Sequence, residues 1–143
     1  MTVARILAEK GGHVVTTQPY RTVHEAAQEL LRHGVGALVV VDANQDVVGL
    51  ISERDLVAAM ATRGADALLD AVSAHMTAQP RLAYEHDTID ATMETMTVER
   101  RRHLPVVRDG RLCGVVSIGD VVKYRIDAIE SERQALCEYI AQA

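Results

Sequence analysis

The sequence predicts an α/β (α+β) fold made of two copies of one β-α-β-β-α unit, flanked by an N-terminal and a C-terminal helix. Three observations lead to this prediction: a nine-residue segment occurs twice, other segments repeat around it in the same order, and helix-like and strand-like patterns alternate identically in both copies. A unit this small buries too little apolar surface to be stable alone. We therefore expect the two copies to pack sheet to sheet as one module with pseudo-two-fold symmetry.

The repeat is clearest at the end of each copy. Residues 49–57 (GLISERDLV) match residues 114–122 (GVVSIGDVV) at four identical positions, and three further positions exchange one aliphatic residue for another. Residues 37–42 likewise match residues 103–108, and residues 22–26 match residues 88–92. Agreement over three separate segments in one order indicates an internal duplication.

Each copy opens with a short strand and a helix. The β-prone stretches are residues 14–17 and 81–84, and the helices are expected to begin at Thr22 and Thr88. Thr22 and Glu25 fit a capping box, in which the hydroxyl and the carboxylate each satisfy an unpaired backbone N–H group.

Two β-rich runs and a second helix complete each copy. The turn between the runs is residues 42–45 in the first copy and Asp109-Gly110 in the second, and Asp-Gly is a strong hairpin signal. The second helix begins at Ser52 or Ser117.

The segments outside the repeat have helical patterns. A short first helix ends at the glycine pair Gly11-Gly12, residues 65–74 form a helical linker, and one long helix covers residues 117–139. The expected organisation is a first repeat with the N-terminal helix at 1–64, a linker at 65–78, and a second repeat with the long C-terminal helix at 79–143.

Composition excludes several classes of protein. The 143 residues carry a net charge of −5, which argues against a nucleic-acid binder that relies on a basic surface. No apolar run approaches the roughly 18–20 residues of a membrane helix, and residues 1–10 lack the features of a signal peptide. The two cysteines have no CxxC spacing, so we expect free thiols and a cytoplasmic protein with no membrane contact.

The strongest candidates for a binding site are a serine and an aspartate three positions apart. This pair is present twice, as Ser52 with Asp55 and as Ser117 with Asp120. Such a pair can serve only to cap a helix. The same helix start also offers free N–H groups to an anion, with the hydroxyl suited to a phosphate and the carboxylate to a ribose diol. The motif in isolation leaves both interpretations open.

Through these motifs the chain resembles a tandem pair of cystathionine-beta-synthase (CBS) domains, or Bateman module, and in particular the stand-alone bacterial CBS-pair proteins. The resemblance covers nearly the whole chain and rests on residues 49–57, 114–122, 34–42 and 102–107. It implies two related clefts between the repeats that bind adenosine-containing ligands such as AMP, ATP, NAD or S-adenosylmethionine.

The resemblance also implies roles for individual residues. By position, Asp55 and Asp120 would hold ribose hydroxyls, with Ser52 and Ser117 beside phosphate. The other residues expected to bind the ligand are Thr16, Ala37 and Leu38 in one cleft, His103, Leu104 and Pro105 in the other, and the basic residues Arg54, Arg102 and Lys123 near phosphate.

The two copies differ in charge just before their first long strand. Residues 101–103 are Arg-Arg-His, whereas the equivalent residues 35–37 are Val-Gly-Ala. A guanidinium group binds phosphate through two parallel hydrogen bonds, so we expect the cleft served by Asp120 to be the better nucleotide site. The alternative interpretation of the basic run is a solvated helix end.

The expected function is that of a non-enzymatic sensor. No nucleophile–base pair, phosphate-binding glycine loop or metal-ligand spacing can be assigned, so we expect no catalytic residue and no metal. AMP is the expected ligand, with ATP or NAD as alternatives, and its binding would modulate a protein partner in trans.

Self-association is also expected. The last helix carries an apolar stripe consistent with a homodimer interface, formed by Ile126, Ile129, Leu136 and Ile140. The rival functions are a structural or protein-interaction module with degenerate clefts, a small enzyme, and a nucleic-acid binder, the last disfavoured by charge.

Overall fold

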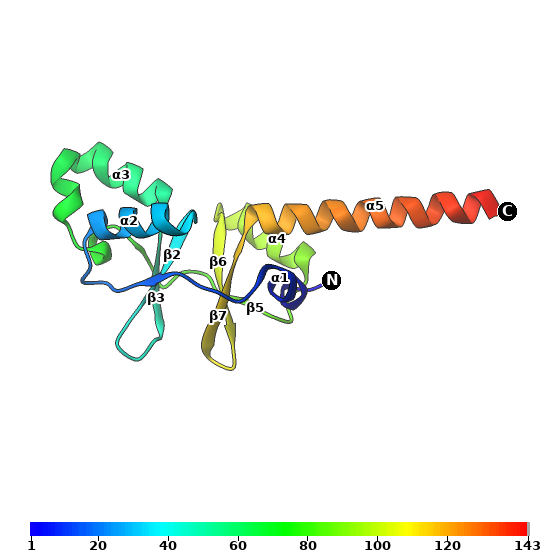
Figure 1. The fold of residues 1–143 in the computed structure, drawn as a ribbon, viewed down its shortest axis with the longest axis horizontal. Coiled ribbons are helices and arrows are strands. Elements are labelled where there is room, and N and C mark those ends of the chain that lie inside the picture. The colour runs from blue at the N-terminus through cyan, green and yellow to red at the C-terminus, as the bar shows by residue number, and fades with distance from the viewer. Residues whose placement is uncertain (143) are drawn as a thin grey trace.

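The computed structural model describes residues 1–142 and has the predicted α/β fold, with one small sheet per repeat (Figure 1). The first sheet has the order β1 (Thr16–Thr17), β2 (Ala37–Val41), β3 (Val47–Ser52) and β4 (Thr77–Ala78), and the second has the order β5 (Ala83–Tyr84), β6 (His103–Arg108) and β7 (Arg111–Ser117). The α-helices are α1 (Val3–Lys10), α2 (Val23–His33), α3 (Glu53–Arg63), α4 (Ile89–Glu99) and α5 (Ile118–Gln142).

Strand pairing repeats between the two sheets. β1 pairs parallel with β2 and β5 parallel with β6, and each of these parallel pairs is connected through a helix, α2 or α4. The hairpins β2–β3 and β6–β7 are antiparallel. Each repeat therefore has the predicted β-α-β-β-α order.

Local sequence signals account for the ends of these elements. The Thr22 hydroxyl accepts a hydrogen bond from the backbone N–H of Glu25 at 3.1 Å, and Thr88 does the same for Ala91. In the β6–β7 turn, Asp109 and Gly110 have φ angles of 51° and 76°, the left-handed conformation that a two-residue hairpin turn requires.

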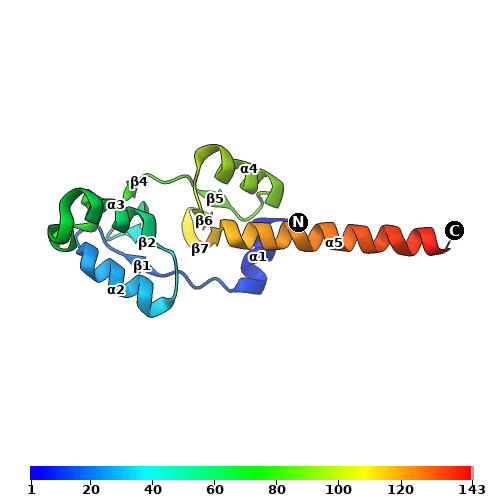
Figure 2. The same ribbon diagram turned by 90° about the horizontal axis from the view of Figure 1, so that it is seen from above.

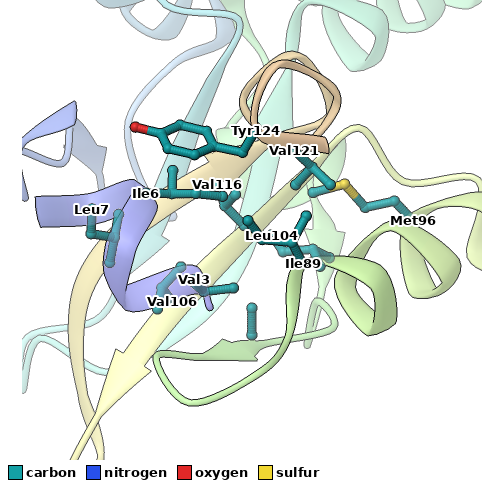
Figure 3. Packing of buried hydrophobic residues seen from close by; sticks show 11 residues of the cluster. Val3, Ile6, Leu7, Ile89, Met96, Leu104, Val106, Val116, Val121 and Tyr124 are labelled. Atoms are coloured by element: carbon teal, nitrogen blue, oxygen red, sulfur yellow. The ribbon is translucent and has the colours of Figure 1, made fainter. Parts of the chain in front are cut away.

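The chain crosses between the repeats at its N-terminus. α1 precedes the first repeat in the sequence, yet Val3, Ile6 and Leu7 pack into the core of the second repeat (Figure 3). That core also contains Ala83, Ile89, Met96, Leu104, Val106, Val116, Val121 and Tyr124. Figure 2 shows α1 beside α5, at the opposite end of the body from α2 and α3.

The segment between the repeats packs on the first repeat. It forms two 3₁₀ helices, η1 (Gly64–Leu69) and η2 (Val72–Ala74), and then the edge strand β4. Val72 is fully buried in the core of the first repeat. The residues expected to form only a linker therefore extend the first sheet and cover its core.

A third cluster joins the two sheets. Ala37, Val39, Val41 and Leu50 are buried together, and Leu112 and Val115 of the second repeat pack against them. These side chains alternate along their strands with those of the two repeat cores, because successive residues of a strand point to opposite faces. The predicted sheet-to-sheet packing thus has an aliphatic interface.

The last helix extends beyond the body. Val121 and Tyr124 anchor its first turns in the second repeat, whereas residues 129–142 are all exposed and form a projecting rod (Figure 1). Within residues 1–142, no helix combines the length and apolar character needed to span a membrane.

Candidate functional site

Two cavities lie at the boundary between the repeats, and they have related constructions. We call them the Asp55 cleft, of about 260 Å³ at the start of α3, and the Asp120 cleft, of about 330 Å³ near the start of α5. The Asp55 cleft combines residues 52–55 of the first repeat with residues 100–103 of the second. The Asp120 cleft combines Ser117 with residues 34–37, which are the equivalents of 100–103 in the other copy.

The Asp55 cleft is built on the first turn of α3. Asp55 accepts hydrogen bonds from the Ser52 backbone N–H at 2.8 Å and from the Ser52 hydroxyl at 3.1 Å, and the Ser52 oxygen accepts one from the Asp55 N–H at 3.3 Å. The pair therefore forms a complete capping box. The carboxylate is partly exposed to the cleft, at the positive end of the helix dipole.

Basic side chains form the opposite wall of this cleft. Arg100, Arg101 and Arg102 line it from the second repeat, and Arg54 lines it from α3. The Arg101 guanidinium donates a hydrogen bond to the Thr77 hydroxyl of β4 at 3.3 Å, so it reaches across to the first sheet. Glu53 also lines the cavity, so four arginines stand against two carboxylates, and the excess of positive charge suits an anionic ligand.

This arrangement corrects the expected difference between the clefts. The sequence interpretation gave the arginine run to the cleft served by Asp120, but the run lines the cleft served by Asp55. The reason is the packing of the sheets, which brings the loop before the first long strand of one repeat to the helix start of the other. The loop that reaches the Asp120 cleft has no charged residue in positions 34–37.

Asp120 has a protein cation as its partner. The Lys10 ammonium donates a hydrogen bond to the Asp120 carboxylate at 2.7 Å and another to the Val115 carbonyl at 2.9 Å. Burial acts to raise the pKa of Asp120, but the hydrogen bonds from Lys10 and Ser117 outweigh it and lower that pKa. Lys10 and the Ser117 backbone N–H both bind Oδ2 of Asp120, so a ligand that used this oxygen would compete with Lys10.

His103 connects the two clefts, because its ring lines both of them. Its imidazole lies against Gly36, where an added Cβ would approach the ring atoms to 3.3 Å. Burial lowers the pKa of His103, and the positive charge of Lys10 adds to this effect, while Asp120 and Glu53 oppose it. The ring is therefore neutral at pH 7, free to accept one hydrogen bond and donate another.

The lowered pKa of His103 predicts a pH effect on stability. When the pH decreases below about 6.5, the usual histidine pKa, the unfolded chain binds a proton while folded His103 is still neutral. The free energy of unfolding therefore decreases as the pH decreases through this range, and it levels off below the folded pKa. His103→Gln should reduce this loss, measured by urea unfolding at about pH 7.5 and about pH 5.5. His24→Gln, on the exposed face of α2, is the matched control. An equal loss in wild type and His103→Gln would contradict the prediction.

The structure brings some of the expected site residues together and separates others. Ser52, Arg54, Asp55, Arg102 and His103 share the Asp55 cleft, and Ala37, Ser117 and His103 line the Asp120 cleft. Asp120 itself is not among the residues that line this cleft, but it is bonded to Lys10 and Ser117, which are. The remaining expected residues, Thr16, Leu38, Leu104, Pro105 and Lys123, line neither cleft.

Burial and alternation explain these exceptions. Leu38 and Leu104 point into the repeat cores, and Pro105 is buried within β6. Thr16 lines a separate cavity of about 280 Å³ beside α2. The Lys123 ammonium lies 6.0 Å from the ring centre of Tyr124 on α5.

Lys10 was missed at the sequence level, as were Gly36 and Thr77. No local motif connects Lys10 with Asp120, which is 110 residues further along the chain. Within residues 1–142, no group of three or more histidine, cysteine, aspartate or glutamate side chains is arranged to hold a metal ion.

Comparison with known proteins agrees with this architecture. The family model described as CBS domain matches residues 3–62 and 71–127. The CBS-domain containing protein ATU1752 from Agrobacterium tumefaciens has a solved structure that is 47% identical with a TM-score of 0.84, covering 87% of this chain and 92% of that one.

Two similar structures were solved with ligands. The CBS domain pair of protein MJ0100, in complex with 5′-methylthioadenosine and S-adenosyl-L-methionine, is 25% identical with a TM-score of 0.80 over 90% of this chain and 98% of that one. CBSX2, in complex with AMP, is 28% identical with a TM-score of 0.71 over 89% and 97%. With two matched copies and two clefts between two sheets, the chain belongs to the CBS-domain family as a tandem CBS pair.

Proposed function

We propose that the protein is a non-enzymatic regulatory module that binds an adenine nucleotide in the Asp55 cleft. The observation that carries this proposal is the meeting of Asp55, a helix N-terminus and four arginines, which outnumber the two acidic residues Asp55 and Glu53, around one cavity between the repeats. In the proposed pose, Asp55 accepts hydrogen bonds from the ribose hydroxyls, and the phosphate lies among the arginines near Ser52. The relatives that bind AMP or S-adenosyl-L-methionine support a ligand of this class.

AMP is the proposed ligand, with ATP or NAD as alternatives. The Asp120 cleft is proposed to be the weaker site, because Lys10 already neutralises its carboxylate and the loop at 34–37 offers no cation for a phosphate. This assignment reverses the ranking expected from the sequence.

The proposed mechanism is a shift in the packing of the two repeats. A nucleotide in the Asp55 cleft would contact both α3 of the first repeat and residues 100–102 of the second. Its affinity would therefore depend on the position of one repeat relative to the other. A ligand shifts such an equilibrium only by its difference in affinity for the two arrangements. The shift is proposed to be felt by a protein partner in trans, with the protein acting as a homodimer. The free thiols of Cys113 and Cys137 suit the proposed cytoplasmic location.

Thermal unfolding with a panel of nucleotides tests the proposal. AMP, ADP, ATP, NAD, NADH and S-adenosylmethionine are compared with GMP, which keeps the ribose and phosphate but changes the base. A ligand at a hundred times its Kd adds about 2.7 kcal/mol of stability, a shift of several degrees for a domain of this size. We expect a shift with adenine nucleotides only, and less of it at high salt, which screens the arginines.

Two outcomes would redirect the proposal. No shift with any compound would favour the second candidate, a protein-interaction module with degenerate clefts, for which the complete capping box at Asp55 is the supporting observation. Conversion of the bound nucleotide during prolonged incubation, detected by chromatography, would contradict the absence of enzymatic activity.

A further inference from the structure

The exposed side of α5 carries an apolar stripe that continues onto the projecting rod. Its apolar members, each at least 40% exposed, are Val122, Ile126, Ile129, Leu136 and Ile140. The stripe lies on a different face from Val121 and Tyr124, which anchor α5 in the body, because each residue advances the helix by about 100°. Exposed large apolar side chains in one row are typical of an interface.

The stripe has the spacing of a coiled coil. Its members, completed by Arg133, are separated by alternating steps of four and three residues from position 122 to position 140. In heptad terms, Ile126, Arg133 and Ile140 occupy a positions, and Val122, Ile129 and Leu136 occupy d positions. Such a row favours pairing with a second helix of the same period rather than with a flat surface.

We propose that the occupant is the α5 stripe of a second copy, packed antiparallel about a centre at Ser131. In this register, Val122 faces Ile140 of the second copy, Ile126 faces Leu136, and Ile129 faces Arg133. Every a position meets a d position, and the whole stripe of about 27 Å is covered. This inference rests on the homodimer proposed above and is independent of nucleotide binding.

Charge decides between the two orientations. In a parallel pair in register, the two Arg133 side chains would meet in one interior layer, where like charges repel strongly. In the antiparallel pair, each Arg133 faces Ile129 of the other copy and lies next to that copy's Glu130 and Glu132. Within its own chain Arg133 is 3.8 Å from Glu130 and both side chains are largely exposed, so each is free to change partner.

Single and double cysteine variants test the orientation. In a Cys137→Ser background, the double variant Ile126→Cys/Leu136→Cys is compared with the single variant Ile126→Cys, using a short bismaleimide and gels under denaturing conditions. In the antiparallel register, two cysteines at position 126 are about 15 Å apart along the axis, but positions 126 and 136 are adjacent. We expect a covalent dimer from the double variant and at least tenfold less from the single variant. The Cys137→Ser protein alone controls for Cys113, which is partly buried.

Each other outcome overturns the inference in a recognisable way. Efficient cross-linking of the single variant would mean a parallel pair. A dimer in gel filtration with no cross-linking of either variant would place the interface elsewhere, and a wild-type monomer at micromolar concentration would remove the homodimer itself. Circular dichroism verifies that each variant is folded. The AMP thermal shift of the same proteins reports separately on the nucleotide proposal.

Discussion

Asp55→Asn is expected to weaken AMP binding by roughly 10- to 100-fold. A hydrogen bond to a charged group contributes about 1.5–3 kcal/mol, and the neutral amide replaces the charged acceptor that the ribose hydroxyls would use. The substitution nearly preserves side-chain shape, and the amide oxygen can still accept from the Ser52 backbone N–H that Asp55 binds at 2.8 Å. Isothermal titration calorimetry of both proteins measures the difference.

Asp120→Asn is the matched control for this prediction. The two aspartates occupy equivalent positions, each three residues after a capping serine, but Lys10 binds only Asp120. We expect AMP affinity within about twofold of wild type. Urea unfolding of both variants checks the helix caps, whose loss costs about 1 kcal/mol. Weakening by Asp120→Asn alone would move the nucleotide to the other cleft, and equal weakening by the two substitutions would contradict the preference for the Asp55 cleft.

Leu7→Ala is expected to reduce the free energy of unfolding by about 2–5 kcal/mol, the usual cost of emptying a buried leucine site. Leu7 is only 6% exposed and packs on β7, where Gly114 leaves it room: a Cβ at that glycine would lie 2.6 Å from Leu7 Cδ2. The lost contacts join α1 to the second repeat. Urea denaturation measures the loss.

Leu31→Ala is the matched control, since Leu31 also lies in a helix but is 86% exposed. Substitutions at such positions usually change stability by no more than about 0.5 kcal/mol. An equally small change in Leu7→Ala would mean that α1 is not part of the core of the second repeat, and the position of Lys10 at Asp120 would lose its support.

Much of the fold could be predicted from sequence because its signals are local or periodic. The duplicated motif located both helix starts at Ser52 and Ser117, and the structure has the expected hydrogen bonds from Ser52 and Ser117 to their aspartates. The Asp109-Gly110 turn follows from the left-handed conformation that these residue types tolerate. Repetition itself predicted two sheets that share one interface.

The composition of the clefts depends on contacts between distant segments, which no local pattern encodes. Which loop faces which helix start is decided by the packing of two sheets through Val39, Leu50 and Val115. The arginine run therefore lies opposite Asp55 and not beside Asp120. Leu38 and Leu104 were assigned to the clefts by resemblance alone. Because side chains alternate between the two faces of a strand, these two side chains point into the repeat cores instead.

A calorimetric titration of the wild-type protein with AMP is the most direct measurement to make. The difference between a cleft lined by four arginines and a cleft whose aspartate is paired with Lys10 predicts one bound nucleotide per chain. Two equal sites per chain would contradict the asymmetry between the clefts, and the absence of binding by AMP, ATP and NAD would contradict the nucleotide function itself.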